Sequence, residues 1–215
     1  KYYKTFEDIK SQGLDALIIS GANVSHPDLQ RAPFYEQLKE VVEWSYENVT
    51  STLCSCLATH AVLEFKYGQK RCPVGAKHWG VFPHKVVNRV HPLVKGVNTR
   101  FDIPRSRFNE ISELQFAKAE VEVLAKSAIG VHLAVSPDLF RIVFFQGHPE
   151  YDAISLLKEY KREVALYLEN NGTEYPPIPS NYPSLQSQAI LDEYRTKLDS
   201  KKASILASEN FFTTC

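Results

Sequence analysis

Short apolar runs alternate with segments of helical periodicity in the N-terminal part of the chain. The run 14–20, which stops at a glycine, is typical of a buried parallel strand. Residues 35–48 repeat apolar positions every three or four residues and predict a helix. A second strand is predicted at 50–56, and it passes directly into a helix at 57–67. This alternation of strands and helices favours an α/β fold with three layers.

The pattern changes between residues 80 and 146, where several β-like runs follow one another closely. Their spacing predicts an antiparallel portion beside the parallel one, and hence a mixed sheet. These runs are Val81–Val87, Val121–Ala125, Val131–Val135 and Arg141–Gln146. Farther along, residues 152–169 predict a helix and residues 184–208 predict a polar helical tail. The whole pattern predicts a mixed sheet with helices on both faces.

Composition narrows the classes of partner. The 215 residues carry 25 Lys and Arg against 25 Asp and Glu, so the net charge is zero and nucleic acid is not an expected partner. Every apolar run is far shorter than a membrane span, so no membrane association is expected. The four cysteines lack the spacing of a metal site or a disulfide framework, which favours a reduced, cytoplasmic setting without a metal.

Cys56 is the candidate nucleophile. It lies where the predicted strand 50–56 meets the predicted helix 57–67. The positive end of a helix dipole favours a thiolate at such a position. The alternative is a buried core cysteine with no chemical role, since free cysteines are often buried. Cys54, two residues earlier, is expected to serve in packing.

His148 and Glu150 are the candidate base and its orienting partner. They follow a buried strand-like run that ends at Gln146. A nucleophilic cysteine needs a histidine to take its proton and a carboxylate to orient that histidine. The proline between them restricts the backbone and shapes the turn that would bring the two side chains together. A surface loop is the alternative, but together with Cys56 these residues predict a Cys-His-Glu triad.

Several sequence motifs resemble the homoserine O-acyltransferase (homoserine O-succinyltransferase) family, which has a flavodoxin-like fold of the class I glutamine amidotransferase type. The resemblance extends to about Tyr182. It implies an acyltransferase domain over 1–182 that lacks the family's first strand and helix, followed by a helical extension over 183–215. The matching motifs are Phe6-Glu7-Asp8-Ile9, Leu17-Ile18-Ile19-Ser20-Gly21-Ala22, Asn48-Val49-Thr50-Ser51-Thr52-Leu53, Gly80-Val81-Phe82, Ser106-Arg107 and Gly147-His148-Pro149-Glu150-Tyr151-Asp152-Ala153.

The resemblance implies an enzyme of methionine biosynthesis. In this family a cysteine takes an acyl group, succinyl or acetyl, from acyl-CoA and passes it to the hydroxyl of homoserine. The positions of nucleophile, base and orienting carboxylate fall on Cys56, His148 and Glu150. Acyl-CoA would be a co-substrate, and no cofactor is implied. The family also implies a homodimer, and a related hydroxy amino acid is a second possible acceptor.

Further roles follow from the same resemblance. Backbone N–H groups of Ala22 and Leu57 would form an oxyanion hole, and the size of Ser25 would influence the choice of acyl donor. The positions that meet the amino acid substrate fall on Lys77, Ser106, Arg107 and Arg162. A guanidinium such as that of Arg162 suits recognition of a carboxylate.

Two other functions stay open. The first is a glutaminase or amide hydrolase on the same fold. The second is a non-catalytic interaction protein, because Leu57-Ala58-Thr59-His60 replaces the family's usual Trp-Gly-Ala-Gln after the nucleophile. Arg105 is expected to be solvated. The remaining histidines are expected to be structural or exposed; they include His60, His78, His84, His91 and His132.

Overall fold

The computed structural model describes residues 3–22, 24, 26–169 and 174–212, with the backbone alone over 201–212. Its chain forms two compact units, unit 1 (Lys1–Tyr151) and unit 2 (Asp152–Cys215). The domain boundary expected near residue 182 stays a prediction. All three candidate triad residues belong to unit 1.

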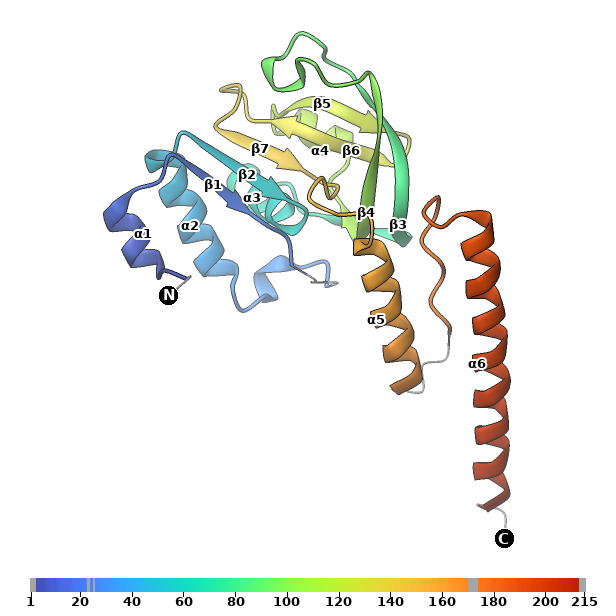
Figure 1. The fold of residues 1–215 in the computed structure, drawn as a ribbon. Helices are drawn as coiled ribbons and strands as arrows, with labels where there is room; N and C mark the ends of the chain where they lie inside the picture. The colour runs from blue at the N-terminus through green and yellow to red at the C-terminus, as the bar shows by residue number, and fades with distance from the viewer. Residues whose placement is uncertain (1–2, 23, 25, 170–173, 213–215) are drawn as a thin grey trace. The chain divides into compact units, whose positions relative to one another are not determined.

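Unit 1 is built on a seven-stranded mixed sheet with the strand order β1-β2-β7-β6-β5-β3-β4 (Figure 1). The first three strands in this order are parallel, and the other neighbours pair antiparallel. The strands are β1 (Ala16–Ile19), β2 (Ser51–Ser55), β3 (Cys72–Val86), β4 (Arg100–Glu110), β5 (Glu122–Ser127), β6 (Gly130–Val135) and β7 (Ile142–Phe145). The predicted mixed α/β sheet is confirmed.

Two strands differ from expectation. The first strand was expected to be buried, but β1 lies at the edge of the sheet and Ile18 is 72% exposed. The whole of β4 escaped prediction, since its charged residues at 100, 102, 105 and 107 conceal the pattern of a strand. In the sheet Arg105 and Arg107 point inward with Ile103 and are buried. The polarity of a residue therefore does not predict its burial in these two strands, because Ile18 is exposed while Arg105 and Arg107 are buried.

One face of the sheet is packed by helices of unit 1. The helices α2 (Tyr35–Asn48), α3 (Leu57–Tyr67) and α4 (Glu113–Lys118) contribute to a core that includes Cys54 and Phe144. Alternate residues of β7, such as Val143, join a second core on the opposite face, where Val94 of the short 3₁₀ helix η2 (Pro92–Val94) also packs. The remaining elements are α1 (Phe6–Gln12) and η1 (Leu29–Arg31).

Unit 2 contains the helices α5 (Ser155–Glu169) and α6 (Leu185–Phe212). Within it the Tyr160 hydroxyl donates to that of Tyr175 at 3.3 Å, and the Tyr167 hydroxyl donates to Asp199 at 3.2 Å. These two helices correspond to the segments 152–169 and 184–208 that the sequence predicts as helical. None of the helices in the described ranges is long and apolar enough to cross a membrane.

Candidate active site

The junction between β2 and α3 holds the candidate nucleophile in an unusual backbone conformation. Cys56 has φ 51° and ψ −109°, a region that non-glycine residues occupy only at a cost of about 1–3 kcal/mol. Its N–H donates to the Phe145 carbonyl oxygen at 2.7 Å, which ties the junction to β7. A sharp, strained turn between strand and helix is how nucleophile side chains are presented in α/β hydrolases. The same geometry here favours a chemical role for Cys56.

Cys54 is placed differently. It is completely buried in the core beneath α3, and burial raises the pKa of its thiol to about 12. Because the thiolate is the reactive form of cysteine, this side chain stays inert at neutral pH. The expected packing role of Cys54 agrees with this position.

The loop after β1 passes close to Cys56. A Cβ added at Gly21 would lie 3.0 Å from the Cys56 Cβ and 3.5 Å from the Leu57 nitrogen. Leu57 is the first residue of α3, so its N–H has no acceptor within the helix. Ala22, which follows Gly21 in the loop, accepts a hydrogen bond from the Val24 N–H through its carbonyl oxygen. The loop after β1 and the Leu57 amide, both expected in the oxyanion hole, are therefore neighbours beside Cys56.

His148 and Glu150 follow the end of β7. The His148 N–H donates to the Pro104 carbonyl oxygen at 3.0 Å, which anchors the residue to β4. The His148 Nδ1 lies 2.8 Å from Glu150 Oε1, so it donates its proton to the carboxylate. The Tyr151 ring stacks on the imidazole with 4.2 Å between ring centroids. The turn through Pro149 therefore does bring base and carboxylate together.

The charges around His148 control its protonation. Burial lowers its pKa, but the hydrogen bonds with Cys56 and Glu150 and the negative charge of these groups outweigh burial and raise the pKa to about 9. Burial is the largest single influence on the Glu150 pKa and raises it, but the hydrogen bonds from His148, from its own backbone N–H and from Ser55, together with the charge of His148, outweigh burial and lower the pKa. An imidazole whose protonated form is stabilised by both a cysteine and a carboxylate is suited to act as the base for a cysteine nucleophile.

Ser55 is a further residue of this site that the sequence pattern did not indicate. Its Oγ lies 3.3 Å from Glu150 Oε1 and 3.4 Å from Oε2, and the residue is only 3% exposed. The one available signal was its position directly before Cys56 at the end of a predicted strand. That signal is weak, because serine is common at strand ends.

Lys77 and Ser106 lie on the paired strands β3 and β4. The Lys77 Nζ is 3.8 Å from the centroid of the Trp79 ring and 5.4 Å from that of Phe108. Ser106 pairs with Trp79 across the two strands, so the two candidate substrate residues occupy neighbouring positions. A cation over an aromatic face is held in place by the quadrupole of the ring.

Arg107 and Arg105 are both buried. Arg107 donates to Glu110 and to the Ile129 carbonyl oxygen, each at 3.1 Å, and its Nε has no partner in the described structure. The expectation that Arg105 is solvated is wrong, because it is 0% exposed and donates to His84 Nε2 at 2.6 Å. Burial, together with the charge of Arg107, lowers the Arg105 pKa to about 8.

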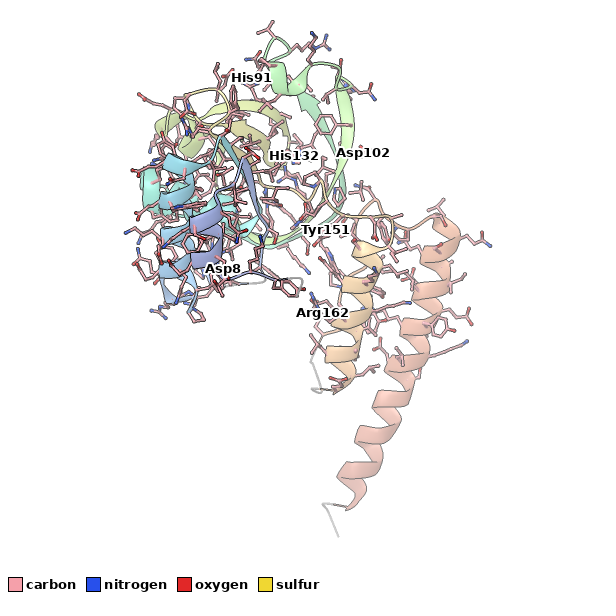
Figure 2. The ribbon with its side chains drawn as sticks, turned by 60° about the vertical axis from the view of Figure 1, so that its left-hand side comes forward. Asp8, His91, Asp102, His132, Tyr151 and Arg162 are labelled. Atoms are coloured by element: carbon pink, nitrogen blue, oxygen red, sulfur yellow. The ribbon has the colours of Figure 1, made fainter. Side chains whose placement is uncertain are left out.

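The two remaining candidate residues are Arg162 and Ser25. Arg162 is on α5 in unit 2, where it is about half exposed and donates to Glu163 at 3.2 Å (Figure 2). Ser25 lies outside the described residues. The roles expected for Arg162 and Ser25 therefore stay predictions.

Two of the other histidines, His60 and His132, are buried in unit 1. His132 lies within the sheet of unit 1 (Figure 2) and is 2% exposed. His60 is equally buried, and its Nε2 lies 3.0 Å from the Gln146 side-chain oxygen. Burial lowers the pKa of His60 to about 3 and that of His132 to about 2. Both stay neutral, so a structural role fits them.

Comparison with known proteins gives a consistent family assignment. The profile of the homoserine O-succinyltransferase family matches residues 1–208. The chain is 63% identical to homoserine O-succinyltransferase from Nitrosococcus oceani over 199 residues, covering 92% of this chain and 56% of that protein. It is 61% identical to the protein of the same name from Thioalkalivibrio nitratireducens, covering 93% of this chain and 56% of that protein. The chain thus spans about half the length of these relatives.

Solved structures support the fold alone. A glutamine amidotransferase from Thermotoga maritima superposes with a TM-score of 0.53 at 14% identity, covering 81% of this chain and 70% of that one. The glutaminase domain of Trypanosoma brucei CTPS, solved with bound acivicin, also gives 0.53, at 12% identity, with 82% and 80% covered. The predicted class I glutamine amidotransferase-like fold is confirmed.

Proposed function

Because the chain belongs to the homoserine O-succinyltransferase family, we propose that it forms the catalytic part of an enzyme that acylates homoserine, as expected for methionine biosynthesis. The observation that carries the proposal is the arrangement of Cys56 at a strained strand-to-helix turn with His148 bonded to Glu150. Acyl-CoA is the proposed donor and co-substrate. The proposed location is the cytoplasm, and the proposed oligomeric state is a homodimer.

In the first half-reaction the Cys56 sulfur attacks the thioester carbonyl carbon of the acyl-CoA. His148 holds the proton taken from Cys56 and passes it to the departing thiolate of coenzyme A. The N–H groups of Leu57 and Ala22 stabilise the negative charge that develops on the carbonyl oxygen, and one such donor contributes about 3 kcal/mol. The product is an acyl thioester on Cys56.

In the second half-reaction the hydroxyl of the amino acid attacks that thioester. His148 takes the hydroxyl proton while the Cys56 sulfur leaves, and Glu150 keeps the imidazole in the correct tautomer. Arg162 would bind the acceptor carboxylate through its planar guanidinium. Lys77, Ser106 and the unpaired Nε of Arg107 are the proposed contacts of the rest of the amino acid.

The choice between succinyl and acetyl donors is proposed to depend on Ser25. A small side chain at this position leaves room for a longer acyl group, whereas a glutamate would repel a succinyl carboxylate. Ser25 therefore favours succinyl-CoA as donor.

Intact-mass analysis tests the proposal directly. The protein is mixed separately with succinyl-CoA and acetyl-CoA, without acceptor, and Cys54→Ala serves as the matched control. We expect one acyl adduct on Cys56 that disappears when homoserine is added. Release of ammonia from glutamine, with no adduct from either donor, would instead favour the glutaminase. Absence of both reactions would favour the non-catalytic function.

A further inference from the structure

Ser55 is the residue of β2 that immediately precedes Cys56. Its hydroxyl lies almost equally far from the two carboxylate oxygens of Glu150, at 3.3 and 3.4 Å. The serine is buried, at 3% exposure. A buried hydroxyl normally has a hydrogen-bond partner, and here the carboxylate of the triad is that partner.

The carboxylate needs such a contact. The Glu150 side chain is 45% exposed, so packing alone does not fix its rotamer. The His148 imidazole that it must orient is only 9% exposed. Its contact with His148 Nδ1 uses Oε1 at 2.8 Å. A flexible side chain that orients a base gains from a second, rigid donor, because catalytic groups require close control of their position.

The other buried hydroxyls near this junction have different partners. Thr52, on the same strand, donates to the Ser45 hydroxyl at 3.1 Å. Thr59 donates to the carbonyl oxygens of Cys54 and Phe145 at 2.8 and 2.9 Å. These contacts hold elements of the fold together, whereas the Ser55 contact ends on a group that touches the candidate base.

We infer that Ser55 is a positioning residue of the triad, whose hydroxyl holds the Glu150 carboxylate against His148. The inference rests on the proposed function. Because Ser55 and Cys56 are consecutive, the peptide that carries the nucleophile also controls the orientation of the base. A displacement of the β2 end would then shift both partners of His148 together.

A double-mutant cycle with Ser55→Ala, Glu150→Ala and the combined variant tests this role. The readouts are the rate of Cys56 alkylation by iodoacetamide and the rate of acylation by succinyl-CoA. We expect Ser55→Ala to slow both reactions roughly tenfold, the value of a hydrogen bond to a charged group. In the Glu150→Ala background the same change should alter them by less than about twofold, since the partner is gone. Ser55→Thr, which retains the hydroxyl, should recover most of the rate.

Thr52→Val is the matched control, since it removes a buried hydroxyl from the same strand without touching the triad; thermal unfolding checks the folding of every variant. An equal loss from Ser55→Ala with and without the carboxylate would overturn the positioning role, as would an unchanged rate in Ser55→Ala. A lower His148 pKa in Ser55→Ala, measured by NMR, would support it independently. Alkylation that responds as expected without any acylation would retain the role of Ser55 and refute the proposed acyl transfer.

Discussion

The parallel and the antiparallel parts of the sheet both bury histidine, but they treat it in opposite ways. His148, after parallel strand β7, is 7% exposed and has its pKa raised to about 9. His132, on antiparallel strand β6, is 2% exposed and has its pKa lowered to about 2. Burial is similar, so it does not explain the difference. The decisive factor is the partner. His148 is hydrogen-bonded to Cys56 and to the Glu150 carboxylate, which favour its protonated form. Burial lowers the pKa of His132, and the nearby histidine and arginine charges lower it further.

The comparison extends to the position of polar groups along the strands. In the parallel part they lie just beyond the carboxyl ends of β2 and β7, where open α/β sheets bind their ligands. In the antiparallel part Arg105 and His84 lie within the strands and bind each other at 2.6 Å. The first arrangement leaves Cys56 and Glu150 partly exposed, and the second encloses Arg105 and His84. The role of a polar or charged residue therefore depends on whether it lies within a strand or beyond the end of one.

The largest effect is expected from the nucleophile itself. Cys56→Ala should abolish acylation because no other thiol of the described residues lies at the strained turn, and Cys54→Ala should retain most of it because Cys54 is buried in the core. Intact-mass analysis with acyl-CoA measures both. An acyl adduct that persists in Cys56→Ala and is lost in Cys54→Ala would reverse the assignment and remove the contrast between the two cysteines.

The base should come next. His148→Ala should slow both half-reactions by about 10²–10⁴-fold, since a single general base serves both. Glu150→Gln should cost less, because the carboxylate orients and stabilises the imidazole without moving a proton. Stopped-flow rates for acylation and transfer separate the variants. A larger loss in Glu150→Gln than in His148→Ala would contradict the roles assigned to this pair.

Arg162→Ala examines the one candidate residue of unit 2. It should weaken binding of the amino acid acceptor by about 2–3 kcal/mol, through loss of a charge-assisted bidentate contact, and leave the acylation half-reaction nearly unchanged. Acceptor titration gives the change in KM, and Arg162→Lys is the control, since a point charge should rescue poorly. Failure to acylate Cys56, or an unchanged acceptor KM, would exclude the carboxylate-binding role.

The smallest effect should come from the enclosed histidine of the antiparallel part. The His132 pKa is about 2 when folded and about 6.5 when unfolded, so the unfolded state binds more protons below pH 6.5 and stability falls as the pH falls. This should cost about 2 kcal/mol between pH 7 and pH 5. His132→Phe should remove that part of the pH dependence. Urea unfolding at both pH values measures it, and an unchanged difference would mean that His132 becomes protonated in the folded protein.

Prediction from sequence succeeded where periodicity and local chemistry agree. The segments that became α2, β2 and α3 carry apolar positions at the spacing of their structure, and the junction at Cys56 followed from them. Prediction failed for β4, because buried arginines resemble an exposed strand until the partners that satisfy them are known. It also failed for Ser55, whose role depends on a residue 95 positions away.

The sequence alone determined the alternation of strands and helices on either side of Cys56, the mixed character of the sheet and the three residue types of a candidate triad, because these depend on local periodicity and on motifs a few residues long. The tertiary structure decided that β1 lies at an edge, that Arg105 and Arg107 are enclosed and that Ser55 meets Glu150. It also decided which buried histidine gains a proton and which stays neutral. These properties depend on solvent exclusion and on distances between charges, which arise only when segments far apart in the chain pack together.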